Sequence, residues 1–219
     1  CIISTGASSD YYDQSLLQQE FYNILMRKCL ELKYLDMESI KHQIFYFPEA
    51  KSCLDSLCEL SCDTSTDPSY FYGLASICQY IQKIIITNTN TKVNHGIVKL
   101  IEVQRNLRYF EWIDNSFGEL ELDPYDDFDF EDIYEKTFLA LEKKADTLNH
   151  LIMSFQFIEY HERSFPQKLL AELHGLKTLI IKTLKTSSSE EQLETLVYRD
   201  LEIFNIDYVG IYTAACIIR

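Results

Sequence analysis

Two stretches decide the fold: "NLRYFEWI", residues 106–113, and "TLNHLIMS", residues 147–154. Both place apolar residues in the same frame, which reads apolar, two variable, apolar, one variable, apolar. The second and third apolar positions are two residues apart, so in an extended strand they share one face, and their neighbours lie on the other. The frame therefore predicts a strand in each stretch with one buried face.

The same frame returns along the chain at near-constant spacing. Successive frames start 25, 24, 26, 41, 28 and 25 residues apart. One match is common in a chain with 47% hydrophobic residues, but seven regularly spaced matches indicate an internal repeat. The frames are Leu32, Leu35, Met37; Leu57, Leu60, Cys62; Ile81, Ile84, Ile86; Leu107, Phe110, Trp112; Leu148, Leu151, Met153; Leu176, Leu179, Ile181; and Leu201, Phe204, Ile206.

Helical spacing or composition fills the stretches between frames. We expect helices within residues 68–80, 94–106, 133–146 and 189–200. Asp67 before Pro68, Asn94, and Ser189 before an acidic turn are suitable helix-entry signals.

A strand and a helix repeated every 24 to 28 residues predict an α/β fold. Its economical form is a solenoid (horseshoe), with a parallel sheet on one side and helices on the other. Residues 1–219 would form a single domain of about seven repeats. A doubly wound α/β sheet is disfavoured because no G-x-G-x-x-G turn occurs, and an all-helical array because "KIIITN" and "KTLIIKT" are β-branched.

The 41-residue interval contains an acidic insertion, residues 114–132, which carries nine of the chain's acidic residues and no basic one. Without it, the formal charge of -14 would be -14 + 9 = -5. Its simplest interpretation is a solvated loop, and the alternative is a docking loop for a basic partner. Calcium binding is disfavoured because the D-x-D-x-D-G order is absent. The overall charge disfavours nucleic acid and anionic membranes as partners.

The frame is that of leucine-rich repeats. The sequences "SLCELSCDTS", "GIVKLIEVQRNLRYFEW" and "LHGLKTLIIKT" resemble the leucine-rich-repeat region of the fungal families of F-box proteins. The resemblance extends over roughly residues 30–219. The resemblance implies the substrate-recognition part of an SCF-type ubiquitin ligase. There the repeats hold a target protein and an F-box binds a Skp1-like adaptor. A standalone leucine-rich-repeat scaffold or inhibitor, unrelated to ubiquitination, is the alternative.

Two features depart from the family pattern. No F-box is visible in residues 1–30, so we expect one before Cys1, which would make the chain a fragment of a longer protein. The asparagine usual eight residues after the first leucine is matched only by Asn115; the other positions hold Ile40, Ser65, Thr89, Gln156, Leu184 and Val209. We therefore expect the turn after each strand to be closed in other ways.

The alternation of side chains along each strand predicts which of them lie on the face opposite the core. Among these residues we expect a protein-binding surface on the sheet, because Ile85, Ile152 and Ile180 are apolar where water is expected. A covering loop or the acidic insertion would also explain these isoleucines. The proposed surface contains Tyr34, Asp36, Glu59, Lys83, Ile85, Tyr109, Glu111, His150, Ile152, Thr178, Ile180 and Asn205.

No catalytic, cofactor or metal motif is evident. Cys53, Cys58 and Cys62 lack a tight C-x(2–4)-C pair with a second pair, so we expect core or half-buried thiols. The five histidines form no H-E-x-x-H, and no G-x-S-x-G occurs. We therefore expect a binding module and no enzyme. An alternative is an enzyme that binds a metal ion through the acidic loop. It would need tight binding of divalent ions, which calorimetry can test. Seven cysteines and no N-x-S/T sequon favour an intracellular compartment, cytoplasmic or nuclear.

Overall fold

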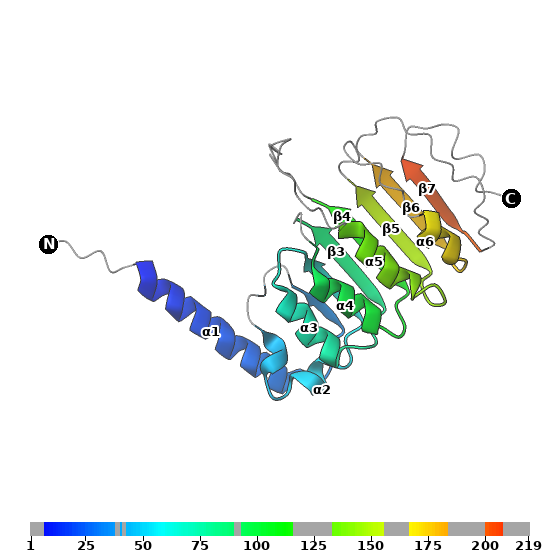
Figure 1. The fold of residues 1–219 in the computed structure, drawn as a ribbon. Coiled ribbons are helices and arrows are strands. Elements are labelled where there is room, and N and C mark those ends of the chain that lie inside the picture. Colours follow the sequence, from blue (N-terminus) through cyan, green and yellow to red (C-terminus); the bar gives the residue numbers. More distant parts are fainter. Residues whose placement is uncertain are drawn as a thin grey trace.

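The structure is a computed structural model that describes residues 7–37, 40, 43–89, 93–115, 133–155, 167–183 and 200–207. Strands and helices alternate through these residues (Figure 1). The strands are β1 Tyr34–Asp36, β2 Glu59–Asp63, β3 Lys83–Asn88, β4 Tyr109–Asp114, β5 His150–Phe155, β6 Thr178–Thr183 and β7 Ile203–Asp207. The helices are α1 Ala7–Lys28, the 3-10 helix η1 Ile44–Tyr46, α2 Ala50–Leu54, α3 Pro68–Ile77, α4 His95–Val103, α5 Ile133–Glu142 and α6 Gln167–Glu172.

The described strands form one parallel sheet in the order β1-β2-β3-β4-β5-β6-β7. The predicted α/β class and the predicted strands are therefore confirmed. The second apolar residue of every frame lies in register with that of the next. These residues are Leu35, Leu60, Ile84, Phe110, Leu151, Leu179 and Phe204.

The carbonyl just before each strand accepts hydrogen bonds from two successive backbone amides at the start of the next strand. This contact fixes where the next strand begins. The Arg108 carbonyl accepts from the Asn149 and His150 amides, both at 2.9 Å. The Asn149 carbonyl accepts in the same way from Lys177 and Thr178, at 2.7 and 3.0 Å. The pattern holds at all six strand junctions, so the longer interval between β4 and β5 does not change the register.

Helices α3, α4, α5 and α6 lie along one face of the sheet, as Figure 1 shows. The core fills the space between these layers. The inward positions of the strands, such as Phe110 and Leu151, are fully buried, and so are Phe71 of α3 and Leu100 of α4. A unit therefore covers its apolar strand residues by packing against its neighbours.

Two predicted helix caps are confirmed. The Asp67 carboxylate accepts from the Ser69 amide at 2.8 Å, and the Asn94 side chain accepts from the Ile97 amide at 3.2 Å. Helices α3 and α4 lie within the predicted stretches, and they end at Ile77 and Val103 because Cys78 and Gln104 have extended backbones. Residues 189–199, in the fourth expected helix, lie outside the described residues.

Helix α1 was not predicted. At its C-terminal end, Tyr22 and Leu25 pack on the core and Met26 is buried. Figure 1 shows that the helix extends away from the body of the domain. In the first unit, η1 and the five-residue α2 stand where the later units have longer helices.

Candidate functional site

The outer face of the sheet, opposite the helices, is the candidate site. Two adjacent rows of side chains cross it, and the strand registers bring all twelve residues of the predicted surface into these rows. The first row contains Tyr34, Glu59, Lys83, Tyr109, His150, Thr178 and Ile203. The second row contains Asp36, Ser61, Ile85, Glu111, Ile152, Ile180 and Asn205.

Charged and aromatic side chains of the first row contact one another across strands β2 to β4. Glu59 Oε2 lies 3.4 Å from Lys83 Nζ, and this ammonium lies 5.1 Å from the centre of the Tyr109 ring. The Tyr109 hydroxyl donates to Glu111 Oε2 at 2.7 Å. Burial raises the pKa of Tyr109, and the hydrogen bond to Glu111 adds to the shift, so the phenol stays protonated at neutral pH.

The same row continues onto strands β5 and β6. The rings of Tyr109 and His150 have centres 6.0 Å apart, and His150 Nδ1 lies 3.0 Å from the Thr178 hydroxyl. Contacts between neighbours thus connect five consecutive strands, from Glu59 to Thr178. Such contacts limit the rotamers that each side chain can adopt, so the row is ordered before anything contacts it.

Thr178 differs from the expectation of an exposed binding residue. It lies on the outer face, but its side chain is only 6% exposed. The short side chain sits between the His150 ring and Ile203 of the last strand, and both are larger. Thr178 therefore positions His150 and offers little surface to a partner.

The second row holds the three isoleucines that the sequence singled out. Ile152 and Ile180 are direct cross-strand neighbours, and Glu111 separates them from Ile85. All three are half-buried, and Ile152 and Ile180 shield each other across the two strands. The helices α3 to α6 lie on the opposite face, so this apolar row is not part of the core that they cover.

Sequence reasoning missed a buried polar row at the carboxyl ends of β2 to β4. The Thr64 hydroxyl donates to Asn88 Oδ1 at 3.0 Å, and Asn88 Nδ2 donates to Asp114 Oδ1 at 2.9 Å. These residues follow the first apolar residue of their frame by seven positions, one fewer than the expected eight. Inward residues recur every second position along a strand, so Thr64 follows Leu60 and Cys62 on the buried face. Extending this alternation by one step would have found the row.

Asp114 corrects the expected boundary of the acidic insertion. It was placed in the insertion, but it ends β4, is only 5% exposed and accepts three hydrogen bonds. Besides Asn88, the donors are Trp112 Nε1 at 2.7 Å and the Tyr134 hydroxyl at 2.6 Å. Strand alternation turns this carboxylate inward. Residues 116–132 of the insertion lie outside the described part of the chain.

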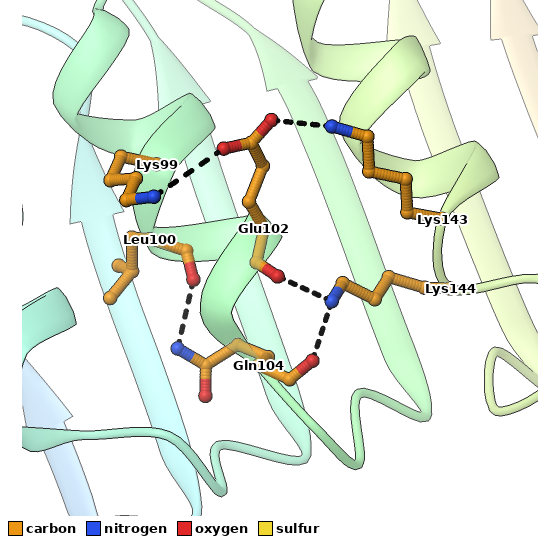
Figure 2. Close-up of polar contacts among 6 residues, drawn as sticks. All are labelled: Lys99, Leu100, Glu102, Gln104, Lys143 and Lys144. Atoms are coloured by element: carbon orange, nitrogen blue, oxygen red, sulfur yellow. Dashed lines mark hydrogen bonds and ion pairs between the residues drawn. The ribbon is translucent and has the colours of Figure 1, made fainter.

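A second polar cluster lies between helix α4 and the turn after α5 (Figure 2). Lys144 Nζ donates at 2.6 Å to both the Glu102 and the Gln104 carbonyls, where α4 ends. Lys143 donates to Glu102 Oε1 at 2.7 Å, and Lys99 lies 3.8 Å from Glu102 Oε2. Cations suit the carboxyl end of a helix, so this cluster connects two neighbouring units.

The cluster also shifts two pKa values. The hydrogen bond from Lys143 lowers the pKa of Glu102, and burial lowers the pKa of Lys144.

Gln104 completes the junction. Its side chain donates to the carbonyls of Leu100 and Cys78, at 2.8 and 2.9 Å, and accepts from the Ile81 amide at 2.9 Å.

The cysteines in the described part of the chain are core thiols, as expected. Cys53, Cys62 and Cys78 are buried, while Cys29 and Cys58 are half-buried. Burial raises the pKa of Cys53 to about 11 and that of Cys78 to about 12, so these thiols stay protonated at neutral pH. Within the described ranges, no group of three or more metal-ligating side chains could hold an ion.

Comparisons with protein-family models, curated proteins and solved structures found no match to this chain. Where the structure describes the helices, none combines the length and the apolar character needed to cross a membrane.

Proposed function

We propose that the chain is a protein-recognition module whose outer face holds a target protein. The observation that carries this proposal is the row of half-buried isoleucines on the face opposite the helices, next to a row of mutually contacting polar side chains. Apolar groups surrounded by polar ones are typical of protein-binding surfaces. The matching registers and repeated junctions support a leucine-rich-repeat type of solenoid, which presents a sheet in this way.

The charges of the outer face favour a basic partner. Along the described strands β1 to β4, its side chains carry four carboxylates, from Asp36, Glu59, Asp63 and Glu111, against the ammonium of Lys83. Electrostatic complementarity raises association rates and selects partners of opposite charge. We infer that the target places a basic segment over β1 and β2, with an apolar side chain near Ile152.

The resemblance of the sequence to fungal F-box proteins supports a more specific role. In that role, the module selects substrates for an SCF-type ubiquitin ligase, and an F-box encoded upstream of Cys1 binds the Skp1-like adaptor. In the alternative, the same face serves a standalone scaffold or inhibitor. Both roles use the outer face, and they differ in whether the full-length protein binds the adaptor.

Substitution on the outer face tests the binding proposal. We expect Ile152→Asp combined with Glu59→Lys, which reverses a carboxylate of the acidic face, to remove the target proteins that co-purify with the full-length protein in its own cells. Leu139→Asp is the matched control, because Leu139 is an exposed apolar residue on helix α5. The control should retain these proteins. If the outer-face variant keeps its native melting curve and every bound protein, the proposal is wrong.

The ligase role needs a separate measurement. We expect the codons upstream of Cys1 to encode an F-box, and the full-length protein to recover the Skp1-like adaptor even when the outer face is substituted. Recovery of targets without the adaptor would favour the standalone scaffold. A catalytic or membrane-spanning domain encoded upstream would contradict the ligase role.

A further inference from the structure

Helix α1 carries an apolar stripe that the described part of the domain leaves exposed. Leu17, Phe21 and Ile24 are 71%, 61% and 57% exposed, and they follow one another by four and three residues. This spacing places them on one side of the helix, as in the seam of a coiled coil. The buried side of α1 is different and is marked by Met26. Figure 1 shows that α1 extends away from the body of the domain.

The charges beside the stripe are self-complementary in one arrangement only. Glu20 and Arg27 flank the same side of the stripe, one heptad apart. If two copies of α1 pair in antiparallel orientation, this side of one helix faces the same side of the other. Glu20 of each copy then lies near Arg27 of the second copy, which gives two attractive pairs.

A parallel pair would lose these contacts. There Glu20 would face Leu25 of the second helix, and the two Lys28 side chains, which continue the stripe, would lie side by side. Antiparallel pairing instead places Lys28 beside Leu17, where its aliphatic stem can cover the leucine while the ammonium reaches water.

We propose that α1 is a self-association element, through which two copies of this chain form an antiparallel helix pair. Ile24 of one copy packs against Phe21 of the other, and Leu17 packs against the Lys28 stem. Pairing supplies the apolar cover that a projecting helix lacks, and a long helix without tertiary contacts is only marginally stable in water. The proposal does not depend on what the outer face binds.

Sedimentation equilibrium of the whole chain tests this proposal. We expect a reversible dimer, and we expect Phe21→Asp to sediment as a monomer with an unchanged melting curve. Leu139→Asp, which changes an exposed apolar residue of α5, should leave the dimer intact. A wild-type chain that stays monomeric at about 100 micromolar, where a weak specific dimer forms, would overturn the proposal.

A charge exchange tests the orientation. Glu20→Lys and Arg27→Glu should each raise the dissociation constant roughly threefold or more, and the double variant should restore it, because each new lysine faces a new glutamate. Arg27 also lies 3.7 Å from Glu49 of its own chain, so Glu49→Gln is the control and should leave dimerisation unchanged. If the double variant is weaker than both single variants, the antiparallel pairing is wrong.

Discussion

At the scale of single residues, Asp114 shows how one buried carboxylate can connect two units. It accepts from Asn88 of the preceding strand, from Trp112 of its own strand and from Tyr134 of the following helix. Each of these donors is fully or partly buried, so each needs an acceptor inside the protein. The interaction fixes the end of β4 where the acidic segment begins.

Replacing Asp114 by alanine should therefore be costly. We expect the free energy of unfolding to fall by about 3 kcal/mol or more, because three donors lose their acceptor. Trp112 is the only tryptophan of the chain, so its fluorescence during urea denaturation reports this site directly. Asp146→Ala, at an exposed position of the turn after α5, should change stability by less than about 0.5 kcal/mol. Equal losses in the two variants would contradict this role of Asp114.

Glu102 gives a pH-dependent prediction. Its pKa is lowered in the folded protein, so its stabilising effect is fully present above the ordinary value of 4.5 and is lost as the pH falls through the folded value. At pH 7, Glu102→Gln should reduce the free energy of unfolding by about 0.2–1 kcal/mol, a modest amount because the side chain is partly solvated. The difference between the two proteins should shrink below pH 4.5. Urea denaturation at pH 7 and pH 3.5 measures it, and an equal difference at both would contradict the Lys143 contact.

At the scale of elements, the close packing of neighbouring helices depends on Gly96 at the start of α4. A methyl group there would collide with the Pro68 carbonyl oxygen and come within 2.9 Å of the Phe71 Cβ, both in α3. Backbone cannot yield as easily as a flexible side chain. Helices α3 and α4 can therefore approach this closely only because the residue is glycine.

Gly96→Ala should destabilise the protein by about 1–3 kcal/mol, because the two helices must move apart. Gly175→Ala is a matched control, since the nearest atom to its added methyl group would be the Ala145 carbonyl oxygen at 3.9 Å. Thermal denaturation followed by circular dichroism compares the two. A neutral effect of Gly96→Ala would show that α3 and α4 do not pack as described.

The sequence predicted the strands better than the contacts at their ends. Each strand repeats one apolar frame, so Phe110 and Leu151 could be aligned without a structure. The buried row of Thr64, Asn88 and Asp114 escaped, because the apolar frame does not include a polar residue at the last inward position, and Asp114 was assigned to the acidic insertion. The inward direction of this row can be predicted only if the alternation of each strand is extended two residues beyond the frame.

The candidate site was predicted in position but not in its internal contacts. Alternation alone placed Lys83, Tyr109 and His150 on one face. It could not show that an ammonium lies over the Tyr109 ring or that Thr178 is covered, because these depend on side-chain size and rotamer. Helix α1 was missed because its apolar stripe faces away from the core and lies outside the repeating frame.

At the scale of the whole molecule, sequential parallel pairing bears on the proposed binding of a target protein. Because every crossover helix in the described part of the chain passes on the same side, the other face of the sheet keeps a continuous surface across all seven strands (Figure 1). A long target segment can contact several units at once. Because a few residues supply most of the affinity in many protein interfaces, the binding test substitutes residues on two separate strands.

The most direct measurement of this account is photo-crosslinking in the cells that make the protein. A photoreactive phenylalanine analogue replaces Ile152 on the outer face of the full-length protein in one sample, and Leu139 on helix α5 in the other. We expect discrete adducts with other proteins from position 152 and none of these adducts from position 139. Adducts from position 139 alone, or the same adducts from both positions, would contradict the claim that the outer face holds the target.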